Sequence, residues 1–238
     1  MPGLGTIINT AAIVVGGLLG LLFKNLLTKS MEDTLLKASS VCVLFIGIGG
    51  AMQHMLKIAD GALETSGSMM LIICFVLGSI VGELLDIEGA FERFGAWLRK
   101  KTHNESDTGF LSAFIHASLT VCIGAMAIVG SIQDGLLGDY SLLCAKAALD
   151  AVIILVMTAS MGKGSIFSAI PVALLQGGVT LLSRVLAPVF TEAAIANLSY
   201  TGSVMIFCVG LNLVWGKKIK VANLLPTLVF AVLYALVF

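Results

Sequence analysis

Long runs of apolar residues, separated by short segments that carry most of the charge, follow one another along the whole chain. A helix needs about 20 mostly apolar residues to cross a bilayer, with a range of about 17–25. The pattern therefore predicts an all-α, polytopic transmembrane helical bundle that forms one integral membrane domain over residues 1–238. We expect about eight spans, at residues 4–23, 38–56, 67–85, 109–132, 141–161, 164–187, 200–215 and 221–238.

The last two predicted spans are short, so their ends stay open. The seventh could begin earlier, within residues 193–202, and a seven-span arrangement is the alternative. The first apolar run lacks the basic segment that precedes the core of a signal peptide. We therefore expect it to be a retained first span.

Composition supports a membrane protein. Hydrophobic residues make up 58% of the chain and charged residues 12%, whereas a soluble domain carries about 25% charged residues. The net charge is zero, which argues against nucleic-acid binding because that needs a basic surface. The five cysteines lie scattered in apolar runs, so we interpret them as small hydrophobic residues.

The basic residues gather in alternate loops. With eight spans, eleven of the fourteen fall on one side of the membrane, and the positive-inside rule assigns that side to the cytoplasm. Both termini are then expected outside, in a multi-pass protein of the cytoplasmic (inner) membrane. The eleven are Lys24, Lys29, Lys37, Arg93, Arg99, Lys100, Lys101, Lys163, Lys217, Lys218 and Lys220.

Residues 88–104, between the third and fourth spans, combine apolar and basic positions at helical spacing. Phe91, Phe94 and Trp97 recur every three residues, and basic side chains surround them. This pattern is typical of an amphipathic helix on the cytoplasmic membrane surface, with a solvated loop as the alternative.

Two parts of the chain resemble each other. Residues 41–53 match residues 121–133 without a gap, and Gly16 and Gly20 match Gly78 and Gly82. We therefore expect residues 1–56 and 67–132 to be repeat units. Residues 141–238 carry a fainter echo that would be inverted, as in secondary transporters. Chance recurrence of Gly, Val and Ile in an apolar chain is the alternative.

Asp150 and Lys146 lie inside the predicted fifth span. A carboxylate at the centre of a bilayer costs about 2.5–3.5 kcal/mol on insertion scales, so such a residue indicates function. Lys146 and Asp150 are spaced i, i+4 and share one helix face. They could form a structural ion pair, Lys146 could hold the charge of a proton or cation site at Asp150, or Lys146 could reach away to the membrane surface.

The segment Gly124–Asp139, at the end of the fourth span, combines flexible and polar residues. We predict a helix break at Gly130, Gly135 and Gly138 that exposes backbone groups for ion or solute binding. An extracytoplasmic turn is the alternative. The residues expected along a substrate or ion pathway are Asp150, Lys146, Ser131, Gln133, Asp134, Asn9 and His116.

Among these pathway residues, Asn9 and Gln133 are the preferred pair lining a cavity. His116 could relay protons, with hydrogen-bonded packing as the alternative. The pairs Gly16–Gly20 and Gly78–Gly82 are helix-packing motifs that could join helices within one chain or between two. We find no catalytic or metal-ligand pattern, so we expect no enzyme, no metal and no cofactor.

The stretches GTIINTAAIVVGGLLG, GAMAIVGSIQDGLLGD and KAALDAVIILVMTASMGKG together resemble the bacterial membrane family DUF554, the YqgA-like and YdfK-like proteins. The resemblance covers nearly the whole chain and implies a polytopic inner-membrane protein of bacteria. It implies no established activity. Gln133, Asp134, Lys146 and Asp150 fall in its most recognisable region, and no role is carried over to them.

These observations predict a small secondary transporter or channel-like permease for an ion or small solute. In that protein Asp150, with Lys146, would be a gating or coupling charge. The alternative is a non-transporting membrane scaffold, sensor or partner-binding subunit in which the pair is structural. The expected partners are the lipid bilayer and an ion or small solute, and the Gly-rich faces and small size favour a homo-oligomer.

Overall fold

The structure is a computed structural model, and it describes residues 3–24, 26, 28–59, 61–104, 107–123 and 125–237. The first half contains α1 (Leu4–Lys24), α2 (Lys29–Met55), β1 (Leu56–Ala59), β2 (Ala62–Thr65), α3 (Ser68–Leu85), α4 (Ile87–Lys101) and α5 (Phe110–Cys122). The second half contains α6 (Ala125–Leu137), α7 (Ser141–Met161), η1 (Lys163–Ser168), α8 (Ala169–Leu181), α9 (Ser183–Leu186), α10 (Glu192–Trp215), η2 (Val221–Leu224) and α11 (Pro226–Val237).

Six helical segments of the described chain are long and apolar enough to cross a membrane: α1, α2, α3, α7, α10 and the segment Lys163–Leu181. The helices α5 and α6 together would make a seventh span, bent by 60°. Residues Val221–Val237 form a shorter apolar segment. The helical membrane protein that the sequence predicts is confirmed, while the number of helices that cross the bilayer stays a prediction.

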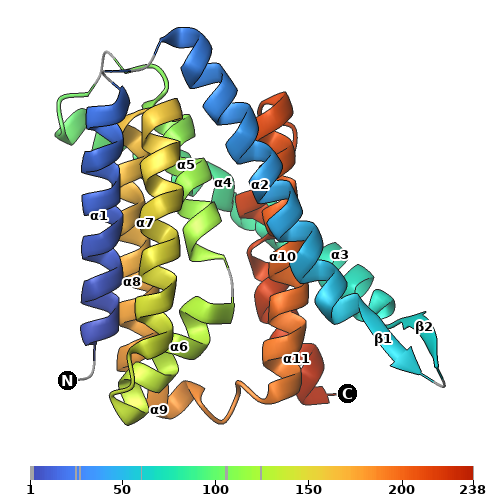
Figure 1. The fold of residues 1–238 in the computed structure, drawn as a ribbon. Helices are drawn as coiled ribbons and strands as arrows, with labels where there is room; N and C mark the ends of the chain where they lie inside the picture. Colours follow the sequence, from blue (N-terminus) through green and yellow to red (C-terminus); the bar gives the residue numbers. More distant parts are fainter. Residues whose placement is uncertain are drawn as a thin grey trace.

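The helices form two groups (Figure 1). In the first, α1 packs along α7, and α5, α6 and α8 complete a bundle around them. In the second, α2 packs along α10, and α3 lies against α11. The two groups meet where α2 contacts α7 and where α10 contacts α5 and α6. The start of α1 and the end of α11 lie at the same end of the molecule.

Glycines allow helices of the same chain to approach each other closely. A Cβ atom on Gly16 would lie 2.3 Å from the carbonyl oxygen of Ala151 on α7, and one on Gly20 would lie 2.4 Å from that of Leu155. On α3, a Cβ on Gly82 would lie 1.8 Å from the carbonyl oxygen of Asn223. The two Gly-x-x-x-Gly motifs therefore pack within one chain, as Gly78 also does against Thr227.

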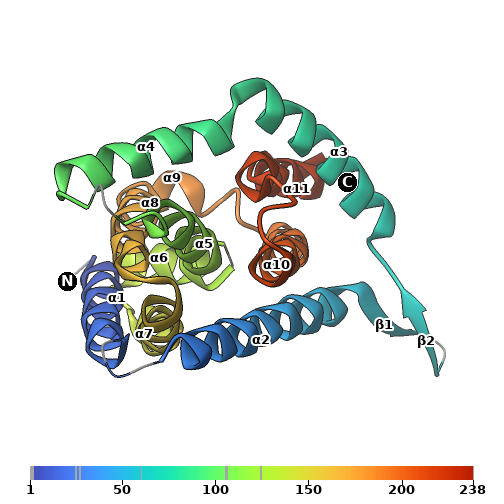
Figure 2. The same ribbon diagram turned by 90° about the horizontal axis from the view of Figure 1, so that it is seen from above.

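The helix α4 runs along one side of the bundle, as Figure 2 shows. The Asp86 side chain caps it by accepting a hydrogen bond from the backbone N–H of Gly89. Phe94 packs against Phe114 of α5 and stacks on Trp97, which is half exposed. Helix α4 is therefore amphipathic, as the spacing of its aromatic residues predicts.

A short antiparallel hairpin was not predicted. Strands β1 and β2 join α2 to α3 and project from the bundle (Figure 2). The hairpin falls in the connection between two of the predicted spans, and the predicted all-α class holds for the bundle itself. The sequence there contains Asp60-Gly61, a dipeptide that favours two-residue hairpin turns.

The helix break also lies elsewhere than predicted. The bend falls between Cys122 and Ala125, whereas Gly130 and Gly135 both lie inside the continuous helix α6. The two glycines serve packing instead: a Cβ on Gly130 would lie 2.8 Å from Leu143, and one on Gly135 would lie 2.4 Å from the Ser183 hydroxyl. Gly138 has φ +68° and follows the end of α6, in the left-handed conformation that is common just after the end of a helix.

Candidate functional site: a polar interior beside a broken helix

The Lys146–Asp150 pair lies inside the first helix group. The Lys146 ammonium is 2.5 Å from Asp150 Oδ2, and both residues are buried. Asn9 of α1 donates a second hydrogen bond to the same Asp150 oxygen, over 3.0 Å. The arrangement in which Lys146 reaches away from Asp150 is therefore not the one observed, and Asn9 joins the pair from a neighbouring helix.

Lys146 also connects this pair to the helix break. Its ammonium donates a hydrogen bond of 2.8 Å to the carbonyl oxygen of Val121, in the last turn of α5. Carbonyls in the last turn of a helix have no intrahelical donor and carry partial negative charge, so they favour a nearby cation. The Lys146 ammonium therefore links the end of α5 to the Asp150 carboxylate, and the three groups satisfy one another.

Asp134 of α6 is a second buried carboxylate in the same bundle. Its side chain is fully buried, and Oδ2 accepts a hydrogen bond of 3.0 Å from the backbone N–H of Gly5 in the first turn of α1. Its other oxygen, Oδ1, has no hydrogen-bond partner among the described residues. Asp134 therefore caps α1 with one oxygen and leaves the other unpaired.

Further buried polar atoms without a partner lie along this bundle. Buried polar groups in proteins are nearly always hydrogen-bonded, to protein atoms or to ordered water, so a concentration of unpaired groups needs an explanation. Of the ten described residues that carry such atoms, all but Thr227 belong to α1, α5, α6, α7, η1 and α8. These nine are Thr6, Asn9, Ser118, Asp134, Thr158, Ser165, Ser168, Gln176 and Thr180.

The unpaired atoms extend along the bundle. Thr6 and Thr180 line a shared cavity of about 440 Å³ near the start of α1. Asn9 lies farther along α1, beside Asp150 of α7. Thr158 lies two turns beyond Asp150 on α7, close to the position of Gly20 near the other end of α1. Polar groups therefore follow the bundle from one end of α1 toward the other.

The remaining predicted residues occupy other positions. Ser131 is buried on α6 and donates a hydrogen bond to the Ala127 carbonyl oxygen one turn before it. Gln133 is half-buried on the same helix, and the described contacts do not bring it to Asn9. Asn9 is hydrogen-bonded to Asp150 instead, and the cavity-lining role of Asn9 and Gln133 stays a prediction.

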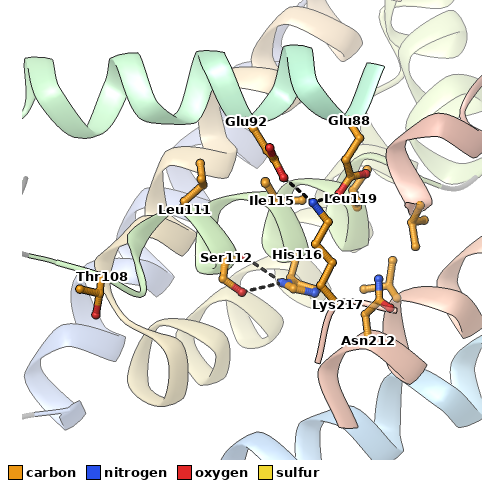
Figure 3. Close-up of a pocket in the computed structure, with 12 residues that line it drawn as sticks. Glu88, Glu92, Thr108, Leu111, Ser112, Ile115, His116, Leu119, Asn212 and Lys217 are labelled. Atoms are coloured by element: carbon orange, nitrogen blue, oxygen red, sulfur yellow. Dashed lines mark hydrogen bonds and ion pairs between the residues drawn. The ribbon is translucent and has the colours of Figure 1, made fainter. Parts of the chain in front are cut away.

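His116 belongs to a different pocket, shown in Figure 3. This cavity of about 270 Å³ lies between α4, α5 and the end of α10. Lys217 points between Glu88 and Glu92 of α4 and forms ion pairs with both, while His116 Nδ1 bonds to Ser112. His116 is thus hydrogen-bonded within its own helix and lies apart from the Lys146–Asp150 pair.

Gln176, Thr180 and Thr6 were not selected as site residues from the sequence. A usable signal existed, because Gln176 and Thr180 are spaced i, i+4 and Thr6 and Asn9 i, i+3, which places each pair on one face of an apolar helix. What the sequence could not supply is that these faces turn toward one another.

Comparison with known proteins gives relatives of similar length. The chain is 26% identical to the Uncharacterized membrane protein YdfK of Bacillus subtilis (strain 168) over 94% of this chain and 92% of the relative. It is 25% identical to the Uncharacterized protein YqgA of Escherichia coli (strain K12) over 96% of this chain and 94% of the relative. No solved structure matches the chain.

The sequence from residue 4 to residue 236 matches the family described as "Protein of unknown function (DUF554)". This match covers nearly the whole chain, including all the residues of the polar interior. The protein is therefore a multi-pass helical membrane protein that belongs to the DUF554 family.

Proposed function

We propose that the protein is a small secondary transporter or channel-like permease that moves an ion or a small polar solute through the bundle of α1, α5, α6, α7 and α8. The single observation behind this proposal is the set of unpaired buried polar atoms in that bundle. A purely structural membrane protein gains nothing from unsatisfied polar groups, because each costs free energy in an apolar environment. Water or a solute passing along them would supply the missing hydrogen bonds.

The Lys146–Asp150 pair is the coupling charge in this proposal. Its two charges neutralise each other at rest, and Lys146 also holds the broken end of α5. Protonation of Asp150, or its contact with a solute, would weaken the ion pair and alter the position of the Lys146 ammonium at the Val121 carbonyl. A change at Asp150 would thereby reach the bend between α5 and α6, which is the irregular part of the bundle.

The proposed setting is the bacterial cytoplasmic membrane, with both termini outside. Basic residues gather after α1, in α4, at the start of η1 and after α10. The start of α1 and the end of α11 lie at one end of the molecule (Figure 1). The positive-inside rule then places these basic segments in the cytoplasm. A homo-oligomer without enzymatic activity remains part of the proposal.

The test is uptake into proteoliposomes that contain the purified protein. A panel of labelled amino acids, organic acids and inorganic ions is offered under an imposed pH gradient or membrane potential. We expect saturable uptake of at least one solute and a loss of at least tenfold in Asp150→Asn, with Asp33→Asn, an exposed acid on α2, as the matched control. Uptake that is unchanged in a folded Asp150→Asn protein would refute the role of this charge.

A non-transporting scaffold is the second candidate, and one observation favours it. The Lys146 ammonium bonds to both Asp150 and the Val121 carbonyl, and the Asn9 amide group donates to Asp150, as members of a structural network do. If the pair is only structural, replacing both charges by apolar residues of similar size should restore both stability and cellular phenotype. If it is a coupling charge, the double variant should fold and remain inactive.

A further inference from the structure

Asp134 differs from Asp150 because it lacks a cationic partner. None of the ion pairs in the described part of the chain includes Asp134, although its side chain is fully buried. The positive end of α1 compensates about half a charge through the Gly5 N–H. The unpaired Oδ1 atom still needs a donor or a cation, because burying a charge is costly unless it is paired.

Residues of two other helices lie next to the neighbours of Asp134. Thr6, the residue after Gly5 on α1, and Thr180 on α8 line a cavity of about 440 Å³ together with Gly135, the residue after Asp134. Helix α6 touches α8 directly after Asp134, because a Cβ on Gly135 would lie 2.5 Å from the carbonyl oxygen of Thr180. Gln176 lies one turn from Thr180 on α8, and its amide has no partner either.

We infer that Asp134, with the hydroxyl oxygens of Thr6 and Thr180 and the amide oxygen of Gln176, forms a binding site for a monovalent alkali cation. Hard cations take carboxylate, hydroxyl and amide oxygens as ligands. One carboxylate among neutral oxygens balances a single positive charge. The described residues offer no group of three acidic, histidine or cysteine side chains, such as a more highly charged ion would use.

A proton fits this set of atoms less well than a cation. A proton on Asp134 Oδ1 would make one hydrogen bond to one acceptor. Unpaired polar atoms would then still remain among the hydroxyls of Thr6 and Thr180 and the amide of Gln176. A cation at the centre of the set would engage several oxygens at once.

This inference rests on the proposed function for its purpose, since the cation would be the transported or coupling ion. The cavity gives it an approach, because the exposed residues Leu181 and Arg184 line this cavity together with Thr6 and Thr180. Arg184 makes no ion pair with Asp134 in the described structure, so its charge does not occupy the site.

Thermal unfolding of the detergent-purified protein tests binding directly. NaCl, KCl and LiCl are titrated against choline chloride at constant ionic strength and pH. A ligand that binds only the folded state stabilises it by RT ln(1 + [L]/Kd), so the unfolding temperature keeps rising with ligand concentration above the dissociation constant. We expect at least one alkali cation to give a concentration-dependent rise that choline does not give, and an equal response to all four salts would overturn the site.

Two variants and a control assign the effect to these residues. Asp134→Asn keeps an acceptor for Gly5 but removes the charge, so the cation response should be lost. Thr180→Val removes one neutral ligand and should weaken the apparent affinity at least fivefold, which keeps the test decisive if Asp134→Asn fails to fold. Asp139→Asn, at an exposed acid just beyond α6, should respond like the unaltered protein.

Failure of the cation site and failure of transport give different results. Suppose that stability responds to pH but not to alkali cations, and that Asp134→Asn abolishes the pH response. Asp134 is then a proton site and the cation inference is wrong, whereas transport in proteoliposomes can still be observed. If cations bind and no solute or ion crosses the membrane, the site stands and the proposed function is wrong.

Discussion

Two buried carboxylates in one bundle have unlike surroundings. Asp150 is paired with Lys146 and Asn9, whereas Asp134 has a single backbone donor. At the scale of single residues the sequence is informative about which charges lie inside the membrane, because a charge in a long apolar run is visible at once. The partners are not visible, since Asn9 and Asp150 are 141 positions apart.

Breaking the Lys146–Asp150 pair should destabilise the protein strongly. We expect Lys146→Met to lower the free energy of unfolding by about 3–5 kcal/mol, because it leaves the buried Asp150 charge uncompensated. The double variant Lys146→Met/Asp150→Leu should recover most of that loss. Denaturation of the protein in mild detergent measures both, and a single variant as stable as the double one would contradict a paired charge.

At the scale of helices, close contacts between backbones decide the packing. Gly82→Ala places a methyl group against the Asn223 carbonyl, and overpacking of this kind typically costs about 1–3 kcal/mol. Gly49→Ala is the matched control, because a Cβ at Gly49 has no atom within 4 Å. We expect a lower unfolding temperature in Gly82→Ala and an unchanged or higher one in Gly49→Ala.

The attachment of α4 should depend on pH through Lys217. Partial burial lowers the pKa of this lysine, but hydrogen bonds with Glu92 and Glu88 outweigh that effect and raise the pKa above its usual value of 10.5. The stabilisation is therefore complete below 10.5 and is lost as the pH rises through the higher pKa of the folded state.

Trp97 of α4 reports this attachment. In a Trp215→Phe background, its fluorescence should change above pH 10.5, where Lys217 loses its charge. Lys217→Gln should show the altered fluorescence already at neutral pH, while Lys218→Gln, at the exposed neighbouring lysine, should titrate like the parent protein. An unaltered signal in Lys217→Gln would show that these ion pairs do not hold α4.

Helix boundaries followed from the apolar pattern more closely than irregular features did. The amphipathic helix at 88–104 is predictable because its aromatic residues recur about once per helical turn and basic residues lie around them. The break between α5 and α6 is not predictable from glycines. Gly130 and Gly135 lie inside α6 and allow neighbouring helices to approach it closely. Glycine can either break a helix or allow close packing of two helices, and only the position of the neighbouring helices shows which role it has.

At the scale of the whole molecule, the orientation in the membrane is open to a direct test. In a background without the native cysteines, Glu64→Cys on the hairpin should react with a membrane-impermeant maleimide added to intact cells. Lys101→Cys on α4 should react only after the cells are opened. The hairpin lies at the same end as the two termini (Figure 1), so the opposite labelling pattern would invert the proposed topology.

The glycine contacts between α1 and α7 have a consequence for motion. Helices α1 and α7 lie in close backbone contact at Gly16 and Gly20, so we expect them to move together as one body. The polar interior lies against that body, and the bent pair α5–α6 supplies its remaining wall. We expect a covalent cross-link from α1 to α7 to leave transport intact, and one from α6 to α8 to stop it, because the gate would then be a hinge at the bend.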